Sequence, residues 1–211
     1  MNAATQKLVL QGGAGAIEAL CDLPSEGPVR GTVVIAHPHP LFGGTMHNKV
    51  VQTLARAFVQ CGWRALRFNF RGVGASAGAY DEGRGEAADL MAVIAQEAPE
   101  GPLALAGFSF GAFVASQAVQ QLGERSPEKI VLVGTAAARF AVAPIAPALH
   151  PRTLVLHGEQ DDTVALTSVM DWARPQSLPV TVIPGVEHFF HGQLPLLKSL
   201  VVRHLLAPAA F

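Results

Sequence analysis

The sequence predicts an α/β protein in which a mainly parallel β-sheet carries helices on both faces. Short apolar runs such as residues 31–36 (GTVVIA) and 129–134 (KIVLVG) have the composition of strands that are buried on both faces. Longer segments with apolar residues at helical spacing alternate with these runs along the chain. This alternation predicts functional loops at the carboxyl ends of the strands.

Length and composition favour a single domain over residues 1–211. Of these residues 50% are hydrophobic and 15% are charged, which suits a chain with a sizeable core and argues against disorder. The formal charge is −1, from 15 basic and 16 acidic residues. No basic patch predicts a nucleic-acid or membrane partner, and no repeat or linker divides the chain.

Features of cellular location point to a soluble protein. The amino-terminal sequence lacks the charged region and continuous apolar stretch of a secretory signal, and no apolar run approaches membrane-spanning length. Cys21 and Cys61 lie in or beside apolar segments, so we expect buried free thiols rather than a disulfide framework. We therefore expect a cytoplasmic protein.

The first elements are expected to form an antiparallel hairpin. Residues 6–11 and 16–23 are strand-like, and the glycine-rich segment 12–15 joins them. That segment lacks the rest of a dinucleotide-binding or P-loop pattern, so a turn is favoured over a phosphate site.

The remaining elements alternate between strand and helix. Further strands are expected at residues 31–36, 63–70, 102–108, 129–134, 152–157 and 180–183. Helices are expected at residues 49–61, 86–98, 110–122, 166–174 and 193–206. A glycine-rich loop occupies residues 71–80, and the Ala/Pro-rich stretch 135–151 has only weak periodicity.

The stretch from Pro102 to Leu122 marks Ser109 as a candidate nucleophile. The segment GFSFG, residues 107–111, fits the G-x-S-x-G nucleophile elbow, in which a strand, a sharp turn and a helix follow one another. Such a turn exposes the serine hydroxyl, and it places the next backbone N–H at a helix N-terminus, where developing negative charge is favoured.

A second G-x-S-x-G, residues 74–78 (GASAG), makes Ser76 a rival. Ser76 stands several loop residues after its strand, and the sequence that follows it, AYDEGRGE, is not an apolar helix. Because an elbow needs strand and helix to adjoin the serine, Ser109 is favoured. Ser76 is expected to shape a loop.

A serine nucleophile needs a histidine base and an acid that orients the histidine. His188 follows the strand that ends at Ile183 and precedes the last helix, whereas His191 is better interpreted as an ordinary loop histidine. Asp161 and Asp162 both follow the strand at residues 152–157. Their positions alone do not decide which aspartate is the acid that orients the histidine, since either could cap the next helix.

The loop after residues 31–36 contains His37, His39 and His47. A metal site there is disfavoured because Pro40 to Gly44 supply no further ligand, and no cofactor is expected. The alternative use is a second oxyanion donor; Pro38 and Pro40 have no N–H, which leaves His39, Leu41 or a later residue. Apolar side chains near these loops could line a substrate pocket, namely Leu41, Phe42, Phe110, Phe189 and Phe190.

The chain resembles the α/β-hydrolase superfamily over nearly its whole length. Five segments in the expected order carry this resemblance: AHPHPLFGGTMHNKVV, ALRFNFRGVGASAG, AGFSFGA, LVLHGEQDDTV and GVEHFFHG. The chain is most similar to the small, lid-less, esterase-like bacterial branch. The resemblance implies Ser109 as nucleophile, Asp161 as acid and His188 as base. It also implies oxyanion donors at the N–H groups of Phe110 and His39.

This resemblance predicts a fold without a cap domain and a serine hydrolase that cleaves small carboxylic esters through an acyl-enzyme. Thioester or peptide hydrolysis on the same triad is the alternative within enzymes. A hydrolase-fold protein that binds a ligand without catalysis is the alternative outside them. The oligomeric state is left open.

Overall fold

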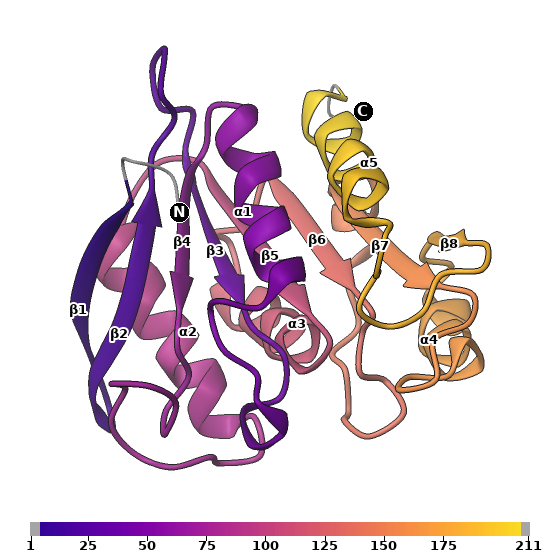
Figure 1. Cartoon of the computed structure of the whole chain (residues 1–211), viewed down its shortest axis with the longest axis horizontal. Coiled ribbons are helices and arrows are strands. Elements are labelled where there is room, and N and C mark those ends of the chain that lie inside the picture. The colour runs from indigo at the N-terminus through magenta and orange to yellow at the C-terminus, as the bar shows by residue number, and fades with distance from the viewer. Residues whose placement is uncertain (1–4, 208–211) are drawn as a thin grey trace.

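A computed structural model describes residues 5–207, which form an eight-stranded sheet of order β1-β2-β4-β3-β5-β6-β7-β8 (Figure 1). The strands are β1 (Gln6–Gly12), β2 (Gly15–Asp22), β3 (Thr32–Ala36), β4 (Arg64–Phe68), β5 (Leu103–Phe108), β6 (Lys129–Val133), β7 (Thr153–Gly158) and β8 (Val180–Ile183). The helices are α1 (Lys49–Gln60), α2 (Arg84–Glu97), α3 (Phe110–Leu122), α4 (Leu166–Ala173) and α5 (Leu194–Leu206). Short 3₁₀ helices occupy Pro40–Phe42, Pro147–Arg152 and Arg174–Gln176.

The pairing of the strands confirms the predicted fold class. β1 and β2 form the antiparallel hairpin, β2 pairs antiparallel with β4, and all pairings from β4 across to β8 are parallel. No cap domain is inserted anywhere in residues 5–207. The carboxyl ends of the parallel strands therefore share one edge of the sheet, toward which their arrowheads point in Figure 1.

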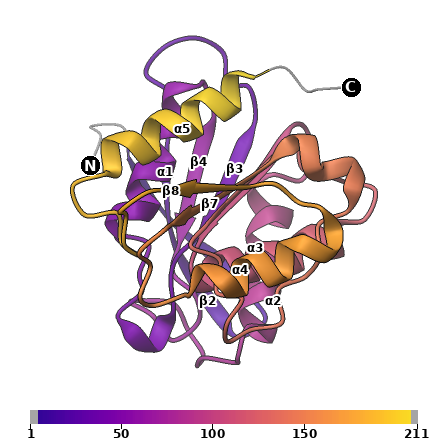
Figure 2. The ribbon, with the colours of Figure 1, turned by 90° about the vertical axis from the view of Figure 1, so that its right-hand side faces the viewer.

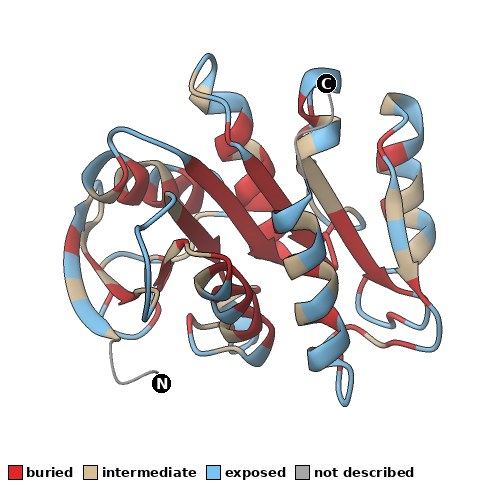
Figure 3. Ribbon diagram, turned by 90° about the horizontal axis from the view of Figure 1, so that it is seen from above, coloured by how far each residue is buried: buried red, intermediate tan, exposed pale blue. Residues whose placement is uncertain are grey.

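Helices cover both faces of the sheet. Helices α1 and α5 lie on one face, and α2, α3 and α4 lie on the other, as the end-on view in Figure 2 shows. Each face has its own apolar core, because alternate side chains of the central strands point to opposite faces. Every residue of β5 and β6 is buried, and the central strands appear red in Figure 3. Their continuous apolar sequences reflect this two-sided burial.

Two segments differ from the sequence-based expectation. Helix α2 begins at Arg84 rather than residue 86, because the buried carboxylate of Glu86 accepts the N–H groups of Asp81 and Gly83 and caps the first turn. The stretch 135–151, for which no element was expected, runs into the 3₁₀ helix Pro147–Arg152. Because this helix is short and contains prolines, its sequence shows no clear helical spacing of apolar residues.

The cysteines follow the prediction: Cys21 and Cys61 are buried and unpaired. Among residues 5–207, no helix combines the length and the apolar character that crossing a membrane requires.

Candidate active site

Ser109 occupies the sharp turn between β5 and α3. Its backbone angles are φ 57° and ψ −117°, a conformation that a residue with a side chain rarely adopts. The turn is held because the N–H of Ser109 donates to the carbonyl of Val133 in β6 (2.8 Å), and the carbonyl of Ser109 accepts the N–H of Ala112 (3.0 Å). The strained residue is thus fixed by the sheet on one side and the helix on the other.

The two glycines of this turn have no room for a side chain. A Cβ at Gly107 would collide with the backbone carbonyl of Gly111. A Cβ at Gly111 would collide with the carbonyls of Ala36 and His37, at the end of β3. Their close approach brings the N-terminus of α3 against the loop that follows β3.

Ser109, His188 and Asp161 form a hydrogen-bonded chain at the carboxyl edge of the sheet. His188 Nε2 lies 3.1 Å from Ser109 Oγ, and His188 Nδ1 lies 2.6 Å from Asp161 Oδ2. Because a carboxylate accepts hydrogen bonds, His188 Nδ1 donates to Asp161, which leaves Nε2 to accept the serine proton. The three side chains follow β5, β8 and β7 and are all buried.

Asp161 and Asp162, which position alone could not separate, lie in different surroundings. Asp161 Oδ1 accepts the N–H groups of Thr163 (3.0 Å) and Val164 (2.7 Å), which fixes the carboxylate toward His188. Asp162 is exposed to solvent. The backbone therefore presents only the first aspartate to the histidine.

His157, the penultimate residue of β7, also belongs to the site but was not predicted from the sequence. Its Nε2 donates to the carbonyl of Val164 (2.9 Å) and lies 3.6 Å from Asp161 Oδ2. Burial lowers the pKa of His157, which favours the neutral ring beside the carboxylate. The signal available in the sequence was its place at the carboxyl end of a strand, four residues before Asp161.

Aromatic rings position His188. Its ring centroid lies 4.8 Å from that of Phe108 and 5.0 Å from that of Phe189. At Gly134 (φ 54°), an added Cβ would lie 3.2 Å from His188 Cε1, so glycine leaves space for the imidazole. His191, in contrast, is exposed and pairs with Glu187 (3.1 Å) on the surface.

His37 shapes the loop after β3 that carries His39. The His37 side chain is buried; its Nδ1 donates to the carbonyl of Pro38 (2.6 Å) and its Nε2 accepts the N–H of Phe70 (3.0 Å). Burial lowers the pKa of His37 to about 4. Since the carbonyl of Pro38 and the N–H of His39 share one trans peptide, the N–H points away from His37.

Two of the N–H groups that the sequence offers as oxyanion donors are unpaired among the described residues. Within residues 5–207, the N–H groups of His39 and Phe110 have no hydrogen-bond partner, whereas the N–H of Leu41 is taken by His39 Nδ1 (3.2 Å). The His39 ring lies 5.0 Å from that of Phe110. Burial, with a smaller contribution from Arg139, lowers the pKa of His39.

Two cavities open onto Ser109. The larger, about 280 Å³, is lined by His188, Phe189, Phe42 and the loop after β3. The smaller, about 50 Å³, is lined by Phe42, Phe110, Phe140 and Val164 among others. Leu41 lines neither cavity, and its side chain is 67% exposed.

In the part of the chain that the structure describes, no three His, Cys, Asp or Glu side chains are placed to hold a metal ion. Both ring nitrogens of His37 are already bonded to backbone groups.

Comparisons with known proteins identify the family and the fold of this chain. Residues 27–150 match the family described as "Serine aminopeptidase, S33". An uncharacterized protein of Rickettsia prowazekii (strain Madrid E) is 34% identical over 170 residues, which are 74% of this chain and 71% of that protein.

Two solved structures are similar along almost the whole chain. A serine hydrolase without a lid from Xanthomonas campestris superposes with a TM-score of 0.86 at 35% identity, covering 97% of this chain and 95% of that one. An α/β serine hydrolase homologue from Coxiella burnetii superposes with a TM-score of 0.81 at 36% identity, covering 96% and 97%.

Proposed function

This chain belongs to the serine aminopeptidase (S33) family of α/β serine hydrolases, and we propose that it cleaves small carboxylic esters through an acyl-enzyme on Ser109. The observation that carries the proposal is the hydrogen-bonded chain from Asp161 through His188 to Ser109. A serine hydroxyl is a weak nucleophile, and this chain supplies the base and the group that orients the base.

In the first half of the reaction, Ser109 Oγ attacks the ester carbonyl carbon as His188 Nε2 takes the hydroxyl proton. Asp161 stabilises the resulting imidazolium. The carbonyl oxygen, now negative, accepts hydrogen bonds from the N–H groups of Phe110 and His39, which have no partner among the residues that the structure describes. The carbon–oxygen bond then breaks, and His188 returns the proton to the departing alcohol.

In the second half, His188 takes a proton from water, whose oxygen attacks the acyl carbon, and then returns it to Ser109 Oγ as the acid is released. The departing alcohol must lie beside His188 Nε2, so we assign it to the larger cavity, which His188 lines. The acyl group then enters the smaller cavity between Phe110 and Val164. A volume of about 50 Å³ supports a preference for short acyl chains.

Esters suit these cavities better than the peptides that the family name suggests. The free amino terminus of a peptide is a cation and is bound by carboxylates. No Asp or Glu side chain lines either cavity, and the formal charge that lines both is the cation Arg139. An aminopeptidase substrate would therefore meet repulsion rather than a partner.

A fluorophosphonate probe tests the proposal directly. We expect one covalent adduct, located by peptide mass mapping on Ser109, and hydrolysis of p-nitrophenyl acetate that the probe abolishes. Ser76→Ala is the matched control, because it removes the serine of the other G-x-S-x-G and should keep both labelling and turnover. An unlabelled Ser109 would favour a binding protein without catalysis.

A panel of substrates separates the enzymatic alternatives. We expect acetyl and propionyl aryl esters to be cleaved faster than octanoyl esters, and faster than alanyl p-nitroanilide. Faster turnover of acetyl thioesters than of matched oxygen esters would assign a thioesterase, and faster release of p-nitroaniline would assign a peptidase.

A further inference from the structure

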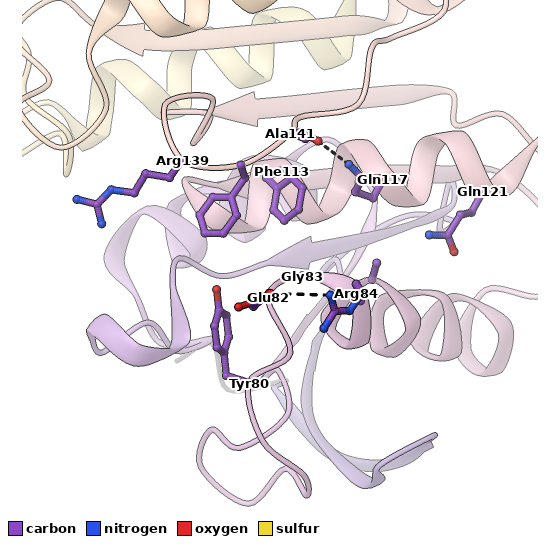
Figure 4. Close-up of a pocket in the computed structure, with 11 residues that line it drawn as sticks. Tyr80, Glu82, Gly83, Arg84, Phe113, Gln117, Gln121, Arg139 and Ala141 are labelled. Carbon is purple, nitrogen blue, oxygen red and sulfur yellow. Dashed lines mark hydrogen bonds and ion pairs between the residues drawn. The ribbon is translucent and has the colours of Figure 1, made fainter.

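One charged side chain, Arg139, borders every cavity around Ser109. It lies in the loop after β6 and lines both the larger and the smaller cavity at Ser109. It also lines a neighbouring hollow of about 650 Å³ (Figure 4), which shares Phe140 with the smaller cavity. The other residues of the two Ser109 cavities are apolar, aromatic, histidine, hydroxyl or amide side chains and glycines, so the charge of Arg139 is not offset there.

Within residues 5–207, Arg139 has no ion-pair partner. Arg84, which lines the neighbouring hollow, differs: it pairs with Asp81 (2.9 Å) and Glu82 (3.8 Å). Figure 4 shows Arg84 and Glu82 joined, whereas the Arg139 side chain extends out of the hollow and away from them. Glu82, the acidic residue that lines this hollow, is therefore already paired with Arg84.

The guanidinium of Arg139 lies over the ring of Phe42, 5.9 Å from its centroid. Phe42 lines both cavities at Ser109, so this contact places the positive charge beside both of them. The net charge of the chain is −1. The positive charge is thus a local property of the site and not of the whole surface.

We propose that the substrates of this enzyme carry a carboxylate and that Arg139 binds it. The inference rests on the proposed ester hydrolysis and narrows its substrate class. A guanidinium presents two parallel N–H groups that match the two oxygens of a carboxylate. Arg139 is exposed, so solvent and salt screen such a pair, and its contribution depends on the guanidinium lying beside Phe42 at the two cavities.

Two pairs of matched esters test the proposal and locate the carboxylate. The alcohol-side pair is p-acetoxybenzoate and its neutral counterpart, p-acetoxybenzamide. The acyl-side pair is p-nitrophenyl hydrogen adipate and its primary amide. For the wild-type chain we expect kcat/KM for the carboxylate to exceed that for the amide by about tenfold in at least one pair, and the preference to shrink with added salt.

In Arg139→Gln, the ratio of carboxylate to amide should fall to about one. Arg84→Gln is the control: it removes the same charge beside the same loop, and it should keep the wild-type ratio. A wild-type ratio near one in both pairs would overturn the proposal, as would an equal fall of the ratio in both variants. Failure to cleave any of the four esters, charged or neutral, would instead overturn the proposed function.

Discussion

The chain contains Gly-x-Ser-x-Gly twice, and the two copies have unrelated structures. At residues 107–111, the serine stands between β5 and α3 with a positive φ, and its hydroxyl faces His188. At residues 74–78, the serine lies in a loop, and its hydroxyl is consumed by backbone groups: Ser76 Oγ accepts the N–H of Glu18 (2.9 Å) and donates to the carbonyl of Asn69 (2.7 Å).

The difference shows that the five-residue motif alone does not identify a nucleophile. A hydroxyl that already donates to a carbonyl and accepts an N–H has no free proton to give and no base beside it. In the elbow, the strand and the helix hold the serine off the sheet, and the next N–H remains free. Ser76 instead fastens its loop to β2.

The largest expected difference is in turnover. Ser109→Ala should lower kcat for a short aryl ester by about ten-thousandfold or more, because the other triad members cannot act without the nucleophile. Ser76→Ala should leave kcat within about twofold but lower the free energy of unfolding by about 1–2 kcal/mol, since it leaves the part-buried N–H of Glu18 and the buried carbonyl of Asn69 without these hydrogen bonds. Ester assays and urea unfolding of both variants measure this. A comparable loss of kcat in the two variants would contradict the assignment of Ser109, and not Ser76, as the nucleophile.

The first glycine of each motif gives the next contrast. Gly107→Ala should destabilise the fold by about 3 kcal/mol, because its Cβ would meet rigid backbone at Gly111. In Gly74→Ala the Cβ would meet the side-chain ends of Asn69 and Glu18, which can move, although the positive φ (58°) adds strain. We expect about half the loss there. Urea midpoints that fell equally would indicate that the elbow is no tighter than the loop.

The next prediction concerns His37, which connects the loop after β3 to the segment before the second Gly-x-Ser-x-Gly. Its side chain orients the loop of His39 and accepts the N–H of Phe70. Its pKa is lowered from 6.5 to about 4, so the unfolded chain binds a proton more readily than the folded one. The free energy of unfolding should therefore fall as pH drops from about 6.5 to about 4, by up to about 3 kcal/mol.

His37→Gln isolates this contribution, because His204 has a similarly lowered pKa and remains in both proteins. The variant should show a flatter decline of urea stability between about pH 7 and pH 4.5 than the wild-type chain. It should also lower kcat for neutral esters, since the His39 peptide loses its anchor. Parallel pH curves would refute the role assigned to His37.

The fold could be predicted from the sequence because continuous apolar strands and periodic helices are local signals. The proximity of Ser109 to His188 followed from the shared edge of a parallel sheet. Asp161 and Asp162 could not be separated by residue pattern, because the choice depends on which N–H groups fix each carboxylate. Arg139 was missed, since its importance lies in the absence of an acidic neighbour, which only the assembled loops reveal.

The smallest expected effect comes from Glu18, which fastens the second motif through Oε2, the acceptor for the N–H of Ala75 (3.0 Å) and Asn69 Nδ2 (2.8 Å). The pKa of Glu18 is lowered, chiefly by the Ala75 N–H, so its contribution to stability is present when the carboxylate is ionised and is lost as pH falls through the lowered pKa. Because solvent screens this half-buried group, Glu18→Gln should cost less than about 1 kcal/mol at neutral pH.

The kcat of the Glu18→Gln variant shows whether the loop of Ser76 has a structural or a catalytic role. Glu18→Gln should leave kcat unchanged while urea unfolding shows the small loss, and the loss should vanish at a pH where the wild-type carboxylate is protonated. A fall in kcat would mean that the loop of Ser76 reaches the chemistry at Ser109. In that case, the two Gly-x-Ser-x-Gly segments would be parts of one site rather than a catalytic turn and a structural fastening.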